Sequence, residues 1–158
     1  MKLSVKIIIS VLACIVIGTS ASIFTNTSLG SWFTTLNKPS WNPPNWLFGP
    51  VWTTLFILMG IAFALVWEEW KPKGNALAKV AMIWFVVQFI FNVLWSFSFF
   101  GLQSPLIGLI NILILLVLIV ITIWRFYGIK PVAAWLLVPY LLWTSFATIL
   151  NGTILMLN

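Results

Sequence analysis

The chain has 158 residues, of which 62% are hydrophobic and only 6% are charged, and its formal net charge is +6. Soluble domains carry about 25% charged residues, so this composition excludes a water-soluble globule, and it equally excludes a disordered chain. The sequence contains no His, no Asp and a single Cys, Cys14. Ser-His-Asp triads, histidine-ligated zinc sites, EF-hands and internal disulfides are therefore excluded, and we predict neither a metal site nor a cofactor.

Charged residues divide the chain into apolar runs of membrane-spanning length. Between residues 80 and 124 there is no charge, whereas a helix crosses the hydrocarbon core in about 20 residues. This run suits two crossings, and its centre, 101–105, has the Gly and Pro of a tight turn. We predict an all-α membrane protein with a single transmembrane domain, 1–158, and a long folded first loop, 26–45. Its five-helix bundle has spans near 5–25, 46–70, 79–101, 105–126 and 132–156.

Basic residues predict the orientation of these spans. The N-terminus shares a side with the second and fourth loops, and this side holds Lys2, Lys6, Lys71, Lys73, Lys79, Arg125 and Lys130. The opposite side holds only Lys38. Because positively charged loops stay in the cytoplasm, we predict a multi-pass protein of the cell membrane with a cytoplasmic N-terminus. The chain has no basic run or stripe, so a nucleic-acid partner is not expected.

The first span has two other interpretations. Residues 1–18 resemble a signal peptide, and residues 11–14 faintly resemble a lipoprotein cleavage site. The apolar stretch continues to Phe24 and four spans follow, which favours a retained helix. Small side chains recur in this helix every four residues, at Cys14, Gly18, Ser22 and Asn26. This spacing favours close packing against a neighbouring helix. The aliphatic fourth span, by contrast, is interpreted as a surface for membrane lipid or a partner helix.

Aromatic and amide side chains share faces on the second, third and fifth spans. These faces carry Trp52 and Phe56; Trp84, Gln88, Asn92, Trp95 and Phe99; and Trp135, Pro139, Trp143, Ala147 and Asn151. Tryptophans near the span ends fit an interfacial belt. An unpaired amide in hydrocarbon is costly, so Gln88, Asn92 and Asn151 should point inward. They either join helices or serve an aromatic pocket that suits a large, planar, mostly apolar ligand.

The first loop is too apolar to remain in water. It contains Trp32, Phe33, Trp41 and Trp46, and prolines at positions 39, 43 and 44 stiffen it. We expect a lid over a cavity that opens on the outer side, with a loop lying on the membrane surface as the alternative. Pro139 should kink the fifth span, and the kink either widens a cavity or is purely architectural.

Three segments together resemble a known family. They are WNPP at 41–44 with FGPVWT at 48–53, the segment 88–100, and the segment 131–151. They closely resemble the translocator protein family, also called the tryptophan-rich sensory protein or peripheral-type benzodiazepine receptor family. The resemblance implies a bacterial member, a homodimer, and one pocket beneath the first loop for porphyrins and other planar apolar molecules. The animal cholesterol motif, a Tyr and a basic residue after the fifth helix, is missing here.

The resemblance also implies the site residues. Positions that match the family's pocket are Phe33, Pro43, Phe48, Trp52, Phe56, Asn92, Trp95, Trp143 and Ala147, and the amide argument adds Gln88 and Asn151. In bacterial relatives, tryptophans that match Trp52 and Trp143 are implicated in the light-dependent breakdown of protoporphyrin IX. Acid–base catalysis lacks its usual groups here, so any reaction must use the excited state of the ligand, with indoles as donors.

We therefore expect a receptor or sensor that binds protoporphyrin IX by stacking and burial, with or without light-dependent degradation. Iron should add little, because the chain has no His and Cys14 lies on a packing helix. A transporter or channel of lipophilic molecules is the alternative. Against this alternative, the sequence shows no membrane-embedded ionisable residue for proton coupling and no visible inverted repeat.

Overall fold

The computed structural model describes residues 1–70 and 75–158 of the chain. In this part of the chain every regular element is a helix, which confirms the predicted fold class. Lys71 and Lys73, which contributed to the predicted orientation, lie outside the described residues. The elements are α1 (Leu3–Ser20), α2 (Ser22–Leu29), α3 (Trp32–Thr35), α4 (Asn45–Glu69), α5 (Ala76–Ser96), the π-helix η1 (Phe97–Gly101), α6 (Pro105–Tyr127), α7 (Pro131–Leu136) and α8 (Val138–Leu157).

Within residues 1–70 and 75–158, five helical segments are long and apolar enough to cross a membrane: Leu3–Leu29, Asn45–Glu69, Ala76–Gly101, Pro105–Tyr127 and Pro131–Leu157. The predicted end of the first span at residue 25 was wrong, because the helix continues through α2 to Leu29. The polar residues 25–28 made this segment look like a loop in the sequence. The Thr27 hydroxyl donates a 2.9 Å hydrogen bond to the Phe24 carbonyl, so it satisfies its polarity within the helix.

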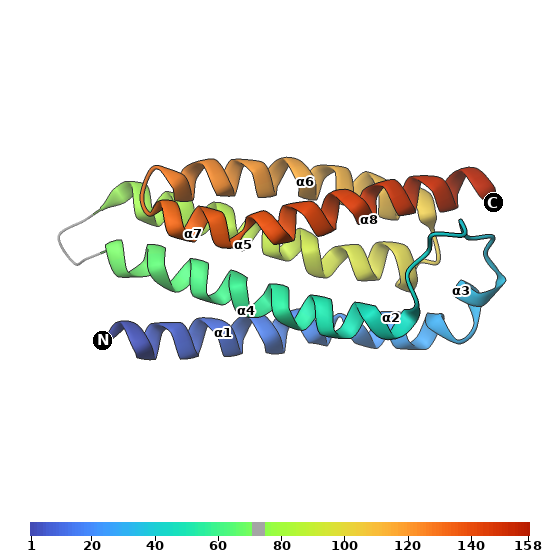
Figure 1. Ribbon diagram of the computed structural model, residues 1–158, viewed down its shortest axis with the longest axis horizontal. Coiled ribbons are helices and arrows are strands. Elements are labelled where there is room, and N and C mark those ends of the chain that lie inside the picture. Colours follow the sequence, from blue (N-terminus) through green and yellow to red (C-terminus); the bar gives the residue numbers. More distant parts are fainter. Residues whose placement is uncertain (71–74) are drawn as a thin grey trace.

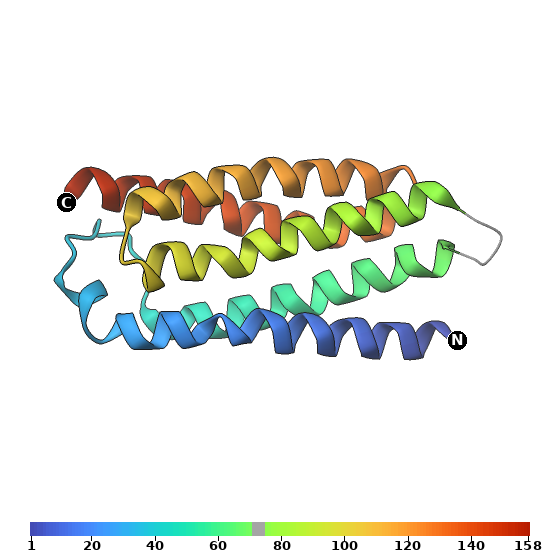
Figure 2. The same cartoon turned by 180° about the vertical axis from the view of Figure 1, so that it is seen from behind.

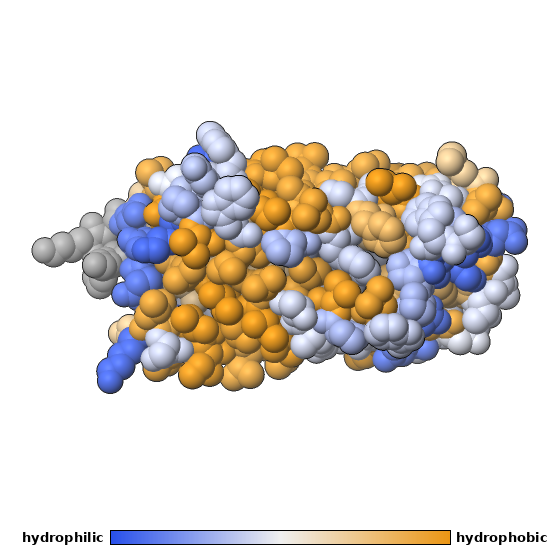
Figure 3. All heavy atoms as spheres, viewed as in Figure 1, coloured by the Kyte–Doolittle hydropathy of each residue, from blue (hydrophilic) through white to orange (hydrophobic). Residues whose placement is uncertain are grey.

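The helices lie side by side in an elongated bundle (Figures 1 and 2). Helix α1 packs on α4, α5 packs on α6, and α6 also packs on α7 and α8. The N-terminus lies at one end, whereas α3 and the end of α8 lie at the other. Apolar side chains cover most of the face seen in Figure 3, and hydrophilic side chains gather toward its two ends. This distribution fits a bundle whose middle lies in lipid.

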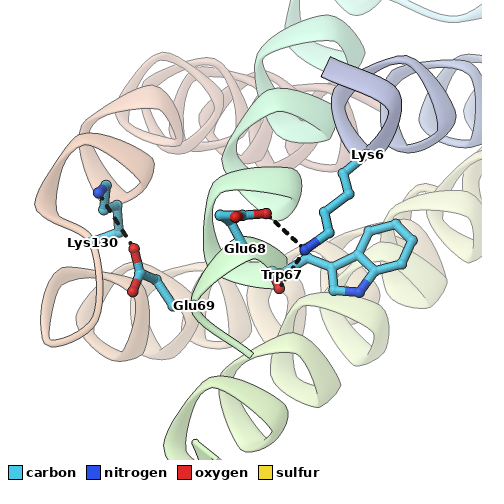
Figure 4. Close-up of polar contacts among 5 residues, drawn as sticks. All are labelled: Lys6, Trp67, Glu68, Glu69 and Lys130. Atoms are coloured by element: carbon cyan, nitrogen blue, oxygen red, sulfur yellow. Dashed lines mark hydrogen bonds and ion pairs between the residues drawn. The ribbon is translucent and has the colours of Figure 1, made fainter. Parts of the chain in front are cut away.

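The only two acidic residues of the chain form ion pairs at the N-terminal end of the bundle (Figure 4). Lys6 Nζ of α1 lies 2.7 Å from Glu68 Oε2, and Lys130 Nζ lies 3.4 Å from Glu69 Oε1. Both carboxylates sit in the last turn of α4, where the helix dipole disfavours negative charge. The lysines offset this effect and join α4 to α1 and to the α6–α7 connection.

The fifth span is interrupted two residues before Pro139. Helix α7 ends at Leu136, α8 begins at Val138, and the backbone N–H of Leu137 bonds to the Ala134 carbonyl at 3.0 Å. Pro139 lacks an N–H and its ring crowds the preceding turn. The helix is therefore interrupted at the place where a kink was predicted.

The third span ends in a π-helical turn, whereas only the connection that follows it was predicted. In η1, the N–H of Leu102 donates to the carbonyl of Phe97 at 2.8 Å, five residues back rather than four. Three consecutive residues, Ser98, Phe99 and Phe100, are buried there. Gln103, in the following turn, has φ 51°, which is uncommon for a residue other than glycine.

The backbones of α1 and α4 lie close together where α4 has a glycine. A Cβ atom on Gly60 would lie 2.5 Å from Val11 Cα, a backbone atom that a rotamer change cannot move. The predicted stripe of small residues on α1 was expected to permit close packing. At this contact, however, α4 supplies the small residue.

Replacing Gly60 with Ala should destabilise the bundle by about 1–3 kcal/mol, because the added methyl group forces α1 and α4 apart. Thermal unfolding in detergent measures the effect. Gly152→Ala on α8 is the matched control, since its Cβ would meet only Leu109 Cδ1, at 3.9 Å. Equal unfolding midpoints for the two variants would contradict the close approach.

Candidate ligand-binding site

A cavity of about 480 Å³ lies between the α1–α2 segment, α4 and α5, next to the loop helix α3. Six of the predicted site residues line it: Phe33, Phe48, Trp52, Phe56, Asn92 and Trp95. They come from α3, α4 and α5, so the first loop and the second and third spans do converge on one hollow. The cavity is at the end of the bundle opposite the ion pairs.

Aromatic rings form the walls of the cavity and hold one another in place. Trp52 stacks on Phe56 with ring centres 5.6 Å apart, and Phe33 lies 5.6 Å from Phe100. Trp95 meets Phe100 edge-on at 6.0 Å. Such pairs each contribute about 0.5–1.5 kcal/mol beyond their buried area, so these flat surfaces are fixed before any ligand arrives.

The first span supplies the polar side of the cavity, which was not predicted. Ser22, Thr25 and Asn26 line it, and Gly18 lies so close to the Phe56 ring that a Cβ atom would overlap it. The stripe of small residues every four positions was the available signal. It was interpreted as helix packing. Gly18 does pack closely on Phe56 of α4, and Gly18, Ser22 and Asn26 also line the cavity.

Five predicted site residues do not line this cavity: Pro43, Gln88, Trp143, Ala147 and Asn151. Helix α8 contributes none of the described lining residues. Trp143 instead lines an open groove between α4 and α8, together with Pro50 and Pro139. Its ring meets edge-on that of Phe48, a lining residue, with ring centres 5.9 Å apart. The kink at Pro139 therefore borders this groove rather than the cavity.

A buried tyrosine explains where the amides of the third span point. The Tyr140 hydroxyl of α8 donates to Gln88 Oε1 at 2.9 Å and accepts from Asn92 Nδ2 at 3.0 Å. Tyr140 is fully buried, and Gln88 is 1% exposed. Both amides therefore point inward, as predicted, and Asn92 also reaches the cavity. Tyr140 itself was not singled out, because a tyrosine beside a proline gave no periodic signal.

Asn151 joins three helices behind the aromatic wall. Its Nδ2 donates to the Pro105 carbonyl at 2.7 Å, and its Oδ1 accepts from Trp95 Nε1 at 3.4 Å. This second contact fixes an indole whose ring lines the cavity. Nearby, the Asn111 amide of α6 pairs with the Ser98 hydroxyl at 3.0 Å.

The first loop folds back over the end of the bundle. Lys38 Nζ donates to the carbonyls of Phe33 and Leu36 at 2.7 and 2.9 Å, and lies 4.8 Å from the centre of the Phe33 ring. The backbone N–H of Asn37 donates to Asn158 Oδ1 at 2.9 Å. These contacts fasten the loop both to itself and to the end of α8, which keeps Phe33 over the cavity.

Replacing Tyr140 with Phe should destabilise the protein by about 1–2 kcal/mol, because Gln88 and Asn92 both lose their shared partner. Thermal unfolding in detergent measures this loss. Tyr127→Phe is the matched control, since Tyr127 is the other tyrosine of the chain and is 56% exposed. A Tyr140→Phe protein as stable as the control would show that the paired amides contribute nothing.

Comparison with known proteins agrees with this architecture. Residues 10–157 match the TspO/MBR family. The chain is 49% identical to tryptophan-rich protein TspO of Chlorobaculum tepidum, over 92% of this chain and 90% of that protein. Identity to tryptophan-rich protein TspO of Archaeoglobus fulgidus is 42%, over 97% of each. Identity to the Homo sapiens translocator protein is 38%, over 76% of this chain and 70% of that one. This multi-pass membrane chain therefore belongs to the TspO/MBR family.

Proposed function

We propose that this protein is a membrane receptor that binds porphyrins, such as protoporphyrin IX, in the cavity between the α1–α2 segment, α4 and α5. The observation that carries the proposal is the cavity wall, in which Phe33, Trp52, Phe56 and Trp95 present flat rings around a 480 Å³ space. Fixed aromatic surfaces with few polar groups suit a large planar ligand. Asn92 and the hydroxyl groups of α2 supply the polar contacts.

The cavity offers no axial ligand for iron. The chain contains no His, and its one thiol, on Cys14, lines a different part of the molecule. Haem iron needs such a ligand to add affinity. The proposal is therefore specific for the flat macrocycle rather than for its metal. Lys38 at the loop has three donors and gives two of them to carbonyls, which leaves one for a carboxylate of the ligand.

Protoporphyrin IX and haemin should bind with dissociation constants that agree within about threefold, because iron finds no ligand in the cavity. Quenching of tryptophan fluorescence during titration of the detergent-solubilised protein measures both constants. Haemin binding about a hundredfold tighter, a difference of about 2.7 kcal/mol, would refute this mode of binding.

A Gly18→Ala variant, studied by the same titration, tests whether the porphyrin binds in this cavity. The added methyl group displaces the Phe56 ring, so porphyrin affinity should fall about tenfold. Gly152→Ala, remote from the cavity, should leave it unchanged. If both variants bind like the parent protein, the porphyrin occupies another place.

We further propose that illumination of the bound porphyrin leads to its breakdown, with an indole as the electron donor and dioxygen as the oxidant. Trp52 lines the cavity directly, whereas Trp143 stands behind Phe48. Electron transfer slows as the distance between donor and porphyrin increases. The geometry therefore favours Trp52 as the direct donor and Trp143 as a more distant, secondary donor.

Trp52→Phe should slow photobleaching of bound protoporphyrin IX by about an order of magnitude, and Trp143→Phe should slow it less, because Trp52 lines the cavity and Trp143 does not. Absorbance decay at saturating porphyrin under constant light measures the rates. Trp135→Phe is the control, since Trp135 is 65% exposed on α7. Unchanged bleaching in a Trp52→Phe, Trp143→Phe double variant would refute the proposal that these two indoles are the donors.

The proposal keeps three finer predictions from the sequence: a bacterial cell membrane, a cytoplasmic N-terminus and a homodimer. Lys6, near the start of α1, and Lys130 pair with the two glutamates at the end of α4 (Figure 4), so both lysines lie at the end of the bundle where the chain begins, which supports the proposed orientation. In this orientation the cavity opens toward the outer side.

A further inference from the structure

A second hollow lies between α1 and α5, with α4 behind it. This cleft has a volume of about 390 Å³. Its sides include Ala13 and Ile17 of α1 and Val93 of α5, and its back is formed by Phe63 and Trp67 of α4. None of the described residues lines both this cleft and the porphyrin cavity. The Phe56–Phe89 ring pair, with centres 6.0 Å apart, stands between the two.

Ser10 gives this cleft a specific polar group. Its side chain lines the cleft, its residue is only 5% exposed, and its Oγ has no hydrogen-bond partner among the described residues. Other hydroxyls of the same span bond to helix carbonyls, as Ser20 Oγ does to the Ile17 carbonyl at 2.6 Å. A buried hydroxyl without a partner costs free energy, so an occupant with an acceptor atom at this place would be favoured.

The cleft is too small to hold a whole helix between α1 and α5. On α1 the lining runs from Ile9 to Ile17, which is about 12 Å at a rise of 1.5 Å per residue. A helix 10–12 Å wide would need roughly 1000 Å³ over that length, more than twice the volume present. The occupant must be thinner and apolar, as a hydrocarbon chain is.

Charge and depth indicate which molecule carries that chain. Lys6 lies one turn before Ser10, so Ser10 is about 6 Å deeper in the bilayer. The headgroup layers are about 5–7 Å thick on each side. If Lys6 lies at the headgroups, Ser10 meets the level at which ester carbonyls of glycerophospholipids begin. Lys2, exposed at the start of α1, is about 12 Å above Ser10, and its long side chain can reach down toward a phosphate.

We propose that this cleft is a binding site for one glycerophospholipid. An acyl chain fills the space between α1 and α5, its ester carbonyl accepts a hydrogen bond from Ser10 Oγ, and its phosphate lies near Lys2. The site is separate from the porphyrin cavity and does not rest on the proposed function.

Photocrosslinking tests the occupancy of the cleft. The full chain is reconstituted in nanodiscs with phosphatidylglycerol that carries a diazirine in one acyl chain, and labelled residues are mapped by mass spectrometry. We expect labelling of cleft residues on α1 and α5 to exceed that of the exposed face of α6 severalfold. Ala13→Trp should fill the cleft and remove this excess, whereas Val16→Trp, on the exposed face of α1, should keep it. Uniform labelling in all proteins would overturn the proposal.

A second measurement tests the hydrogen bond from Ser10. Native mass spectrometry compares retention of an ester-linked phosphatidylglycerol with that of its ether-linked analogue, which lacks the carbonyl. The parent protein should retain the ester about fivefold better, the ratio that one hydrogen bond supplies. Ser10→Ala should remove this preference without unfolding the bundle. Equal retention of both lipids by the parent protein would refute the assigned contact.

The single cysteine distinguishes lipid from a second copy of the chain. Cys14 lines the cleft and is 5% exposed, so a second copy of the chain that met this face symmetrically would bring the two thiols together. A short bismaleimide should give no crosslinked dimer through Cys14, and a dimer in high yield would overturn the proposal. Porphyrin titration of Ala13→Trp should match that of the parent protein, so the two proposals can fail independently.

Discussion

The Tyr140 hydroxyl is the contact on which the rest of the structure depends. It lies between the amides of Gln88 and Asn92, with oxygen–oxygen and nitrogen–oxygen distances of 2.9 and 3.0 Å. Hydrocarbon offers no substitute partner for any of these groups. The bond therefore fixes how α8 faces α5, and through Asn92 it fixes the inner wall of the cavity. Membrane helices lack a hydrophobic force that draws them together, so such polar contacts decide their rotation.

The sequence predicted the spans well because lipid imposes simple rules on length and charge. It also predicted that Gln88, Asn92 and Asn151 point inward, since unpaired amides are costly there. It did not identify Tyr140 as their partner, because pairing across helices depends on rotations that no single helix specifies. Pro43, Gln88, Trp143, Ala147 and Asn151 were predicted for the site, but they stand outside the cavity lining.

The first span shows why the sequence predicted only part of the candidate site. Small residues at a spacing of four are compatible with a tight helix contact and equally with the wall of a hollow. Here the residues do both: Gly18 packs closely on Phe56 of α4, as Gly60 of α4 does on Val11, and Gly18, Ser22 and Asn26 also line the cavity. The same span borders the cleft at Ser10, so one helix serves two separate spaces at different depths.

The π-helix η1 at the end of the third span affects how this segment tolerates the insertion or deletion of a residue. A five-residue hydrogen-bonded loop holds one residue more than an α-helical turn, so it absorbs an insertion locally. Ser98, Phe99 and Phe100 can all be buried there, while the regular helix before them keeps its own phase. Deleting one residue from 97–101 would restore the α-helical repeat and rotate the Phe99–Phe100 pair relative to Asn92. The extra residue thus sets the angular offset between the amide-bearing and ring-bearing halves of one helix.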